Sequence, residues 1–280
     1  MSTMSKATAS LSFLMPEEAC NAHLHIIDPA FPNDGNAASQ LGTIDTYLQL
    51  ANQLRLQRAV FVQAKPFGCD NACLLNAIER FGAANSRGIA VVENSVQDLV
   101  LERLHAGGVR GLRFSVWNPA NAVVSFEDCK PLSQRTKHMN WNMQLHMSAV
   151  QLLEYADVIR SLDCKVVIDH MGRLAPALGV KDPAYHFICE MIDNGNTWVK
   201  LSGPYLNTKI GEPWDDATAT AVAIAEYAPQ RVVWGSDFPH VTEKKKPDPF
   251  MLTEMIAKWL PTEKARQLAL VDNPKELYGF

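Results

Sequence analysis

Short apolar runs alternate with longer amphipathic segments along the whole chain, and this alternation constrains the fold more than any other feature. Eight runs are predicted as strands, at residues 20–26, 59–63, 88–92, 109–115, 143–147, 165–169, 197–201 and 231–235. Strict strand–helix alternation predicts parallel strands joined by right-handed crossovers. Eight such units in about 250 residues predict an α/β fold of the (β/α)8 TIM barrel type rather than an open doubly wound sheet.

The segments between the strands carry apolar residues at positions i, i+3 and i+4, the spacing of a helix with one buried face. They predict helices at 44–54, with Thr43 as the N-cap, and at 71–81, 96–105, 132–138, 150–162, 185–193, 217–227, 250–260 and 262–270. No linker, low-complexity tract or charge block divides the chain. We therefore expect one barrel domain at 17–280, preceded by a leader at 1–16. The absence of G-x-G-x-x-G after the first strand and of a Walker A pattern disfavours nucleotide-binding folds.

Composition excludes several classes of partner. The formal net charge of -4, without a basic stripe, argues against nucleic acid, and the apolar runs are too short for a membrane span. The six cysteines are dispersed in a chain large enough to fold without disulfides, so we expect reduced thiols and a cytoplasmic location. Cys69 and Cys73 could form a reactive or metal-binding pair, but ordinary thiols are the simpler interpretation. Homo-oligomerisation stays open.

The segment N-A-H-L-H-I-I-D at residues 21–28 reads as a short buried strand with two histidines near its end. Side chains two apart on a strand point the same way, so His23 and His25 should converge on one point. Two neutral imidazoles can bind a metal ion or polarise a carbonyl oxygen. The alternative is a histidine pair packed at a strand end, and this alternative weakens if other strands supply partners.

Other strands do supply partners. The active site of a TIM barrel lies at the C-terminal ends of its strands, so polar residues there should gather around one mouth. Residues in such positions are His23, His25, Gln63, Lys65, Arg113, His146, Asp169, His170, Arg173, Ser202, Tyr205, Asp237 and His240. Histidines after strands one, five and six, with an aspartate after strand eight, predict a catalytic centre.

Seven segments together resemble the amidohydrolase superfamily: NAHLHIID, VFVQAKPFGCDN, GVRGLRFS, VVIDHMGR, WVKLSGPY, VVWGSDFPH and VDNPKELYGF. The closer likeness is to the branch of 2-pyrone-4,6-dicarboxylate lactonase and sugar-lactone hydrolases and isomerases, and it covers nearly the whole chain. The resemblance implies that His23, His25, His170 and Asp237 are catalytic. Asp237 would deprotonate water, and the imidazoles would face the developing oxyanion of a lactone. The alternative for Asp237 is a purely structural role as a helix N-cap.

The expected cofactor is none or one Zn²⁺ per chain. No lysine on strand four or five matches the carbamylated bridge of two-metal amidohydrolases, so a binuclear site is not expected. A single ion would be held by His23, His25, His170 and Asp237, and it would polarise the carbonyl and acidify its water. His146 stands where the lactonase has a tyrosine. A fourth imidazole makes one zinc easier to hold, although a substrate-binding role is the other interpretation.

The expected substrate is an anionic lactone, carboxylated or sulfonated. Arg113 matches an arginine that contacts substrate in the lactonase, whereas two further arginines of its dicarboxylate clamp fall near Asn118-Pro119 and Tyr205-Leu206 and are not matched. Lys65 replaces a small hydroxyl residue, and a lysine point charge does not substitute for an arginine fork. We expect Lys65 and Arg113 to hold the anion. The other predicted substrate-binding residues are Gln63, His146, Tyr205 and His240.

Three alternatives to lactone hydrolysis stay open. A lactone isomerase would use the same site. A zinc-dependent decarboxylase of an aromatic or muconate-like acid belongs to a related branch, but that branch typically has a glutamate or threonine near the first strand, where this chain has Asn21. A catalytically silent binding barrel is disfavoured because all four central residues are present.

Overall fold

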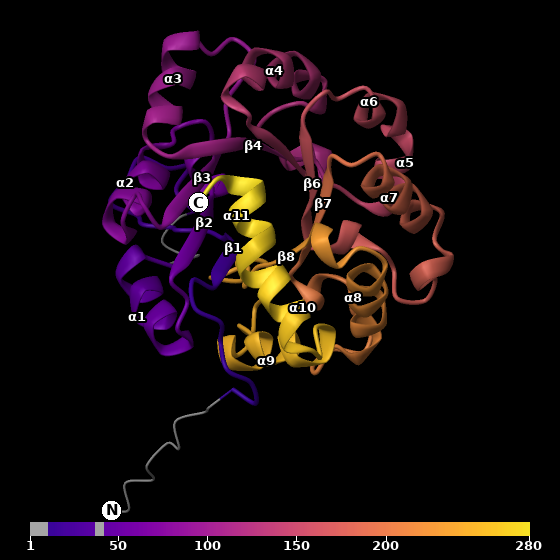
Figure 1. Cartoon of the computed structure of the whole chain (residues 1–280). Helices are drawn as coiled ribbons and strands as arrows, with labels where there is room; N and C mark the ends of the chain where they lie inside the picture. The colour runs from indigo at the N-terminus through magenta and orange to yellow at the C-terminus, as the bar shows by residue number, and fades with distance from the viewer. Residues whose placement is uncertain (1–10, 37–41) are drawn as a thin grey trace, which may run out of the picture.

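The computed structural model describes residues 11–36 and 42–280 and contains one barrel of eight parallel strands surrounded by helices (Figure 1). Each strand pairs with the next in the order β1 to β8. The strands are β1 Cys20–Leu24, β2 Arg58–Val62, β3 Ser86–Ala90, β4 Val109–Ser115, β5 Asn142–His146, β6 Lys165–Ile168, β7 Thr197–Leu201 and β8 Val232–Trp234. The predicted (β/α)8 TIM barrel and all eight predicted strands are confirmed.

Backbone hydrogen bonds between the first and last strand regions close the barrel. The His25 amide donates to the Phe238 carbonyl at 2.7 Å, and the Asp237 amide donates to the His23 carbonyl at 2.9 Å. Closure therefore brings Asp237, three residues after the end of β8, directly beside His23 and His25, although 212 positions separate residues 25 and 237 in the sequence.

The helices form the outer layer of the barrel. They are α1 Ile44–Leu54, α2 Ala72–Phe81, α3 Asp98–Ala106, α4 Cys129–Thr136, α5 Ala149–Glu154, α6 Ala156–Arg160, α7 Pro183–Asp193, α8 Asp215–Tyr227, α9 Pro249–Trp259, α10 Glu263–Gln267 and α11 Asn273–Tyr278. Thr43 caps α1 as predicted, accepting a hydrogen bond from the Thr46 amide. In the described part of the chain, none of the helices combines the length and the apolar composition of a membrane span.

Two helix predictions need correction. The helix predicted at 150–162 is divided at Tyr155 into α5 and α6. The helix predicted to end at Leu270 instead continues through a π-helical turn, Leu268–Asp272, into α11. Pro274 lies in the first turn of α11, directly after the π-helical turn, at a position that proline tolerates.

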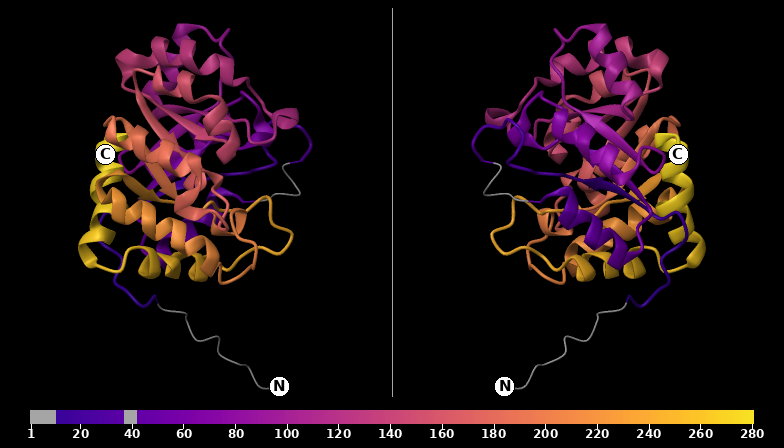
Figure 2. Two further views of the ribbon diagram at one scale, coloured as in Figure 1. Left: turned by 90° about the vertical axis from the view of Figure 1, so that its right-hand side faces the viewer. Right: turned by 90° about the vertical axis from the view of Figure 1, so that its left-hand side faces the viewer.

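Helix α11 covers the end of the barrel at which the strands begin (Figures 1 and 2). Lys165, the first residue of β6, donates its ammonium hydrogen to the Glu276 carbonyl, and Leu277 and Tyr278 pack with apolar residues of the barrel interior. The loops that follow the strands lie at the opposite end of the barrel, which α11 does not cover.

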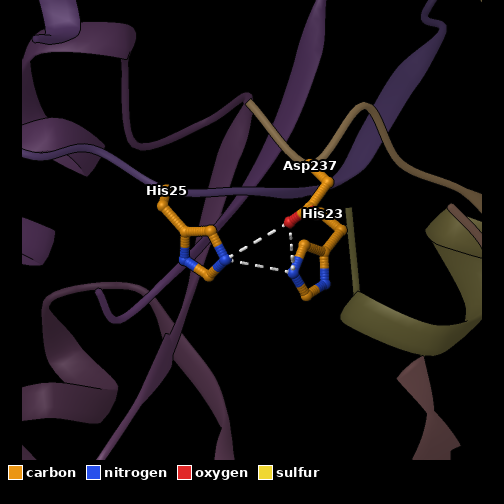
Figure 3. A group of neighbouring side chains, drawn as sticks. All are labelled: His23, His25 and Asp237. Atoms are coloured by element: carbon orange, nitrogen blue, oxygen red, sulfur yellow. Dashed lines mark hydrogen bonds and ion pairs between the residues drawn. The ribbon is translucent and has the colours of Figure 1, made fainter. Parts of the chain in front are cut away.

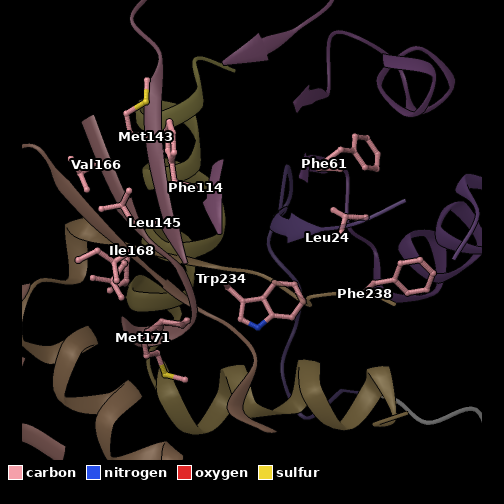
Figure 4. Packing of buried hydrophobic residues seen from close by; sticks show 14 of the residues in the cluster. Leu24, Phe61, Phe114, Met143, Leu145, Val166, Ile168, Met171, Trp234 and Phe238 are labelled. Carbon is pink, nitrogen blue, oxygen red and sulfur yellow. The ribbon is translucent and has the colours of Figure 1, made fainter. Parts of the chain in front are cut away.

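Residues 1–10 of the predicted leader lie outside the described residues. Its last part contacts the barrel: the Ser12 amide donates to Glu254 at 3.0 Å, and Met15 is buried. Most of the core lies between the strands and the helices, where Leu24, Phe114 and Met143 point outward from the barrel (Figure 4). This packing fixes the strand positions and hence the side chains at their ends.

Candidate active site

Three side chains meet at the mouth of the barrel, His23, His25 and Asp237 (Figure 3). The two imidazole Nε2 atoms lie 3.3 Å apart, and Asp237 Oδ1 is 3.4 Å from the first and 3.5 Å from the second. All three residues are buried. The sequence predicted this convergence.

Two local features of the chain place His23 at this point. Between the pairs Asn21–Ala59 and Leu24–Phe61, β1 contains one residue more than β2, so the strict alternation of inward and outward side chains is interrupted. As a result Ala22 points into the barrel and His23 also reaches the site. Gly235 makes room on the other side, because a Cβ there would lie 2.4 Å from the His23 Cβ.

Asp237 is held by two sets of partners. Its Oδ1 faces the imidazoles, and its Oδ2 accepts a hydrogen bond of 2.5 Å from the Tyr205 hydroxyl, which also lies 3.2 Å from His240 Nδ1. Burial raises the pKa of the Asp237 carboxyl, but His170 and the hydrogen bond from His23 outweigh burial and hold this pKa well below its ordinary value. Asp237 is therefore ionised near neutral pH.

Beneath these residues lies a buried ion cluster that the sequence analysis did not predict. Lys200 of β7 is fully buried, with its Nζ 2.8 Å from His23 Nδ1 and 3.1 Å from Asp169 Oδ1, and it also donates to Gln144 Oε1. Arg113 Nε donates to the other Asp169 oxygen at 3.1 Å. Burial lowers the pKa of Lys200 to about 8, against the raising effect of Asp169.

One feature of the sequence does indicate that Lys200 is buried and paired. Lys200 is the one charged residue in the apolar run T-W-V-K-L, and a lysine in a strand buried on both faces requires a partner. Asp169, which directly follows the neighbouring strand β6, is that partner.

A pocket of about 500 Å³ opens above the cluster. Among its lining residues are His25, Lys65, Arg113, His146, His170, Arg173, Tyr205 and Asp237. Asp237 and Glu243 are its only acidic lining residues in the described structure.

Comparison with known proteins identifies the family to which this barrel belongs. The sequence model of the amidohydrolase family matches residues 20–280, from the first residue of β1 to the end of the chain. The chain belongs to the amidohydrolase family. A 4-sulfomuconolactone hydrolase of Rhizobium radiobacter is 30% identical over 97% of this chain and 93% of the relative. A 2-pyrone-4,6-dicarboxylate hydrolase of Comamonas testosteroni is 32% identical over 95% and 92%.

Solved structures agree with this assignment. The crystal structure of an Agrobacterium tumefaciens protein without ligand matches this amidohydrolase with a TM-score of 0.87 at 26% identity, covering 95% of this chain and 97% of that one. The predicted resemblance to the amidohydrolase superfamily is confirmed.

The other predicted residues of this amidohydrolase divide into two groups. His146 and His170 line the pocket, with ring centroids 5.1 Å apart, and their Nδ1 atoms contact Ser115 and Ser202 at 2.9 Å each. Gln63 lies outside this pocket. Its amide donates to the Gly68 and Asp70 carbonyls, so it holds the loop that contains Lys65.

The cationic residues also separate by their surroundings. Lys65 lies in a 3₁₀ turn, Lys65–Phe67, is exposed, and forms no salt bridge within 4.0 Å to a described residue. The Arg173 guanidinium stacks 4.5 Å above the ring of Trp117, which is 46% exposed at the pocket. His240 is buried behind Tyr205 and does not line the pocket.

The spacing of the central triad suits a zinc ion, but its hydrogen bonding does not. A point in the plane of the three ligand atoms lies about 2.0 Å from each, close to zinc–nitrogen and zinc–oxygen bond lengths. Nδ1 of His23, however, faces the Lys200 ammonium, which can only donate. The Nε2 of neutral His23 then carries a proton instead of a free lone pair. His170 groups with His23 and Asp169 rather than with the triad.

Proposed function

We propose that this amidohydrolase opens the ester bond of a lactone that carries a carboxylate or sulfonate group, with Asp237 as the general base. The position of Asp237 carries the proposal: it is an ionised carboxylate beside imidazoles, in a pocket with three cationic side chains. The relatives support it, since the names 4-sulfomuconolactone and 2-pyrone-4,6-dicarboxylate both describe cyclic esters with acidic groups.

Two steps complete the reaction. In the first step, Asp237 Oδ1 takes a proton from water while the water oxygen bonds to the ester carbonyl carbon, and the carbonyl π electrons move onto its oxygen. In the second step, the carbonyl re-forms and the bond to the ring oxygen breaks. The leaving oxygen takes the proton from Asp237, which regenerates the carboxylate.

The low pKa of Asp237 has a cost for this mechanism. It keeps the carboxylate ionised, but it also makes the group a weaker base, so stabilisation of the oxyanion must contribute much of the rate. Burial lowers the pKa of His146 and that of His170, the latter to about 3. Both rings are therefore neutral near pH 7, and each has one N–H to donate. A single well-placed donor contributes about 2.7–4 kcal/mol to such a transition state.

Lys65, Arg113 and Arg173 give the pocket its preference for anions. Arg113 Nε donates a hydrogen bond to Asp169, whereas the two terminal nitrogens of Arg113 have no hydrogen bond to a described residue. A guanidinium with two free nitrogens can bind a carboxylate or sulfonate through parallel hydrogen bonds. Lys65 adds a mobile positive charge at the rim.

The decarboxylase alternative receives no support from Asn21. Its amide donates to the Tyr47 and Ser236 hydroxyls, and its Oδ1 accepts from the Ser236 amide. The side chain is fully buried and is engaged with structural partners instead of lining the pocket.

We also propose a cytoplasmic location. In the described part of the chain all six cysteines are free thiols. Burial raises the pKa of the Cys73 thiol to about 11 and also raises that of Cys69. These two residues are therefore unreactive thiols rather than a nucleophilic pair.

A screen of carboxylated and sulfonated lactones with a pH indicator tests the proposed function, because ring opening releases a proton. We expect turnover of at least one anionic lactone and little turnover of its neutral analogue. NMR of the product separates hydrolysis from isomerisation, since an isomerase would return a lactone. Preference for neutral lactones, release of CO₂ or an isomerised ring would contradict the proposal.

A further inference from the structure

The Lys200 ammonium has three hydrogen atoms and three neighbours. Two of these neighbours can only accept hydrogen bonds: Asp169 Oδ1, which forms an ion pair with the ammonium at 3.1 Å, and Gln144 Oε1, which accepts one of its hydrogens. The third neighbour is His23 Nδ1, at 2.8 Å. Lys200 is fully buried, so its ammonium hydrogens are not exposed to bulk water. His23 Nδ1 is therefore an acceptor, and the proton of the neutral ring lies on Nε2.

His25 has the opposite arrangement. Its Nδ1 lies 2.9 Å from the Val62 carbonyl oxygen, which can only accept, so the proton of the neutral ring lies on Nδ1. Its Nε2 then has a free lone pair directed at the His23 Nε2, 3.3 Å away. The His23 Nε2 hydrogen is shared between this lone pair and Asp237 Oδ1. The two histidines of one motif are thus held as different tautomers.

We propose that Lys200 is a positioning residue that fixes His23 as the Nε2–H tautomer and thereby keeps zinc out of the site. The inference rests on the proposed function only in giving this tautomer a use, namely an N–H beside the base Asp237. A metal ion at the triad would need the His23 Nε2 lone pair, which the proton occupies. The ammonium on the far side of the same ring also repels a dication.

Asp169 shows what happens when Lys200 is removed. Its Oδ1 lies 3.5 Å from His23 Nδ1 and would be the remaining charged acceptor for that atom. An Nδ1–H directed at a carboxylate frees Nε2, which is the arrangement that most zinc-ligating histidines have. Lys200→Met should therefore convert a weak zinc site into a strong one.

The experiment measures zinc affinity at pH 7 by competition with a fluorescent chelator, using metal-free protein. We expect Lys200→Met to bind one Zn²⁺ about ten- to a hundred-fold more tightly than wild type, the range typical of partners of metal-ligating histidines. Lys165→Met is the matched control, because it also removes a lysine from a barrel strand, but at the opposite end, where the ammonium contacts the Glu276 carbonyl and the Trp198 ring. Its zinc affinity should equal that of wild type.

A merely structural role of Lys200 predicts the reverse, since a disturbed site binds metal less well. Equal or weaker zinc binding by a folded Lys200→Met would overturn the proposal. If that variant does not fold, ¹⁵N NMR of the wild-type imidazoles decides the question, with His23→Gln used for assignment. We expect protonated Nε2 in His23 and protonated Nδ1 in His25, and protonated Nδ1 in both would refute the inference. Neither measurement uses a lactone, so the proposed function can fail independently.

Discussion

Replacing Lys65 by methionine removes one cation from the pocket and leaves the ion pairs of the barrel intact. Lys65 is exposed and forms no salt bridge to a described residue, so stability should change by less than about 0.5 kcal/mol. Arg113 is a poorer choice, because its removal also strips a partner from buried Asp169. A change in the kinetics of the Lys65 variant can therefore be attributed to substrate binding and not to loss of stability.

The magnitude follows from the kind of contact. A hydrogen bond to a charged group contributes about 1.5–3 kcal/mol, so KM for an anionic lactone should rise roughly ten- to a hundred-fold. The change in kcat should be smaller, because the contact is made equally in the ground state and the transition state. High salt should reduce the difference between the two proteins, since Lys65 is solvent-exposed.

Steady-state kinetics with a carboxylated lactone and its neutral analogue measure this effect. Lys130→Met, an exposed lysine on α4 outside the pocket, is the matched control and should behave as wild type. An unchanged KM of Lys65→Met for the anionic lactone, or an equal rise of KM for the neutral analogue, would show that Lys65 does not bind the anion.

Two further predictions concern the base and the barrel closure. The pKa of Asp237 is depressed, so its active ionised form is present at neutral pH and is lost only below the ordinary carboxyl range. The plot of kcat/KM against pH should therefore show no fall between pH 7 and pH 5. A fall with a midpoint near 6.5 would indicate a histidine base instead. Gly235→Ala should destabilise the fold by about 1–3 kcal/mol, because the new Cβ would lie 2.4 Å from the His23 Cβ and 2.8 Å from its backbone nitrogen. Thermal denaturation measures this loss, and an unchanged Tm would show that β8 can move away from β1.

Much of this architecture could be predicted from the sequence, because it depends on periodicity. Alternating apolar strands and amphipathic helices gave all eight strands, and the rule that strand ends share one mouth brought Asp237 to His23 and His25. Periodicity fails where packing overrides it. The extra residue in β1 that lets both Ala22 and His23 point inward has no signature in the letters N-A-H-L-H.

The interior of the barrel was harder to predict for a different reason. Lys200, Gln144 and Tyr278 come from β7, β5 and α11, and their contact depends on which side chains fill the same layer inside the barrel. A strand sequence shows that Lys200 needs a partner, but not whether the partner is a substrate, an aspartate or a histidine. Gln63 illustrates the converse case: it lies at a strand end, yet its amide is used by its own loop.

Catalysis by Asp237 is tested most sharply by hydrolysis of an anionic lactone in H₂¹⁸O by wild type and Asp237→Asn, followed by mass spectrometry of the product. The substitution is nearly isosteric, and a folded variant is verified by circular dichroism. Attack of water activated by Asp237 should place one ¹⁸O atom in the newly formed carboxylate, and kcat should fall at least about a hundred- to a thousand-fold in the variant, as for loss of a general base. A product without ¹⁸O, or a variant that turns over at nearly the wild-type rate, would contradict this role of Asp237.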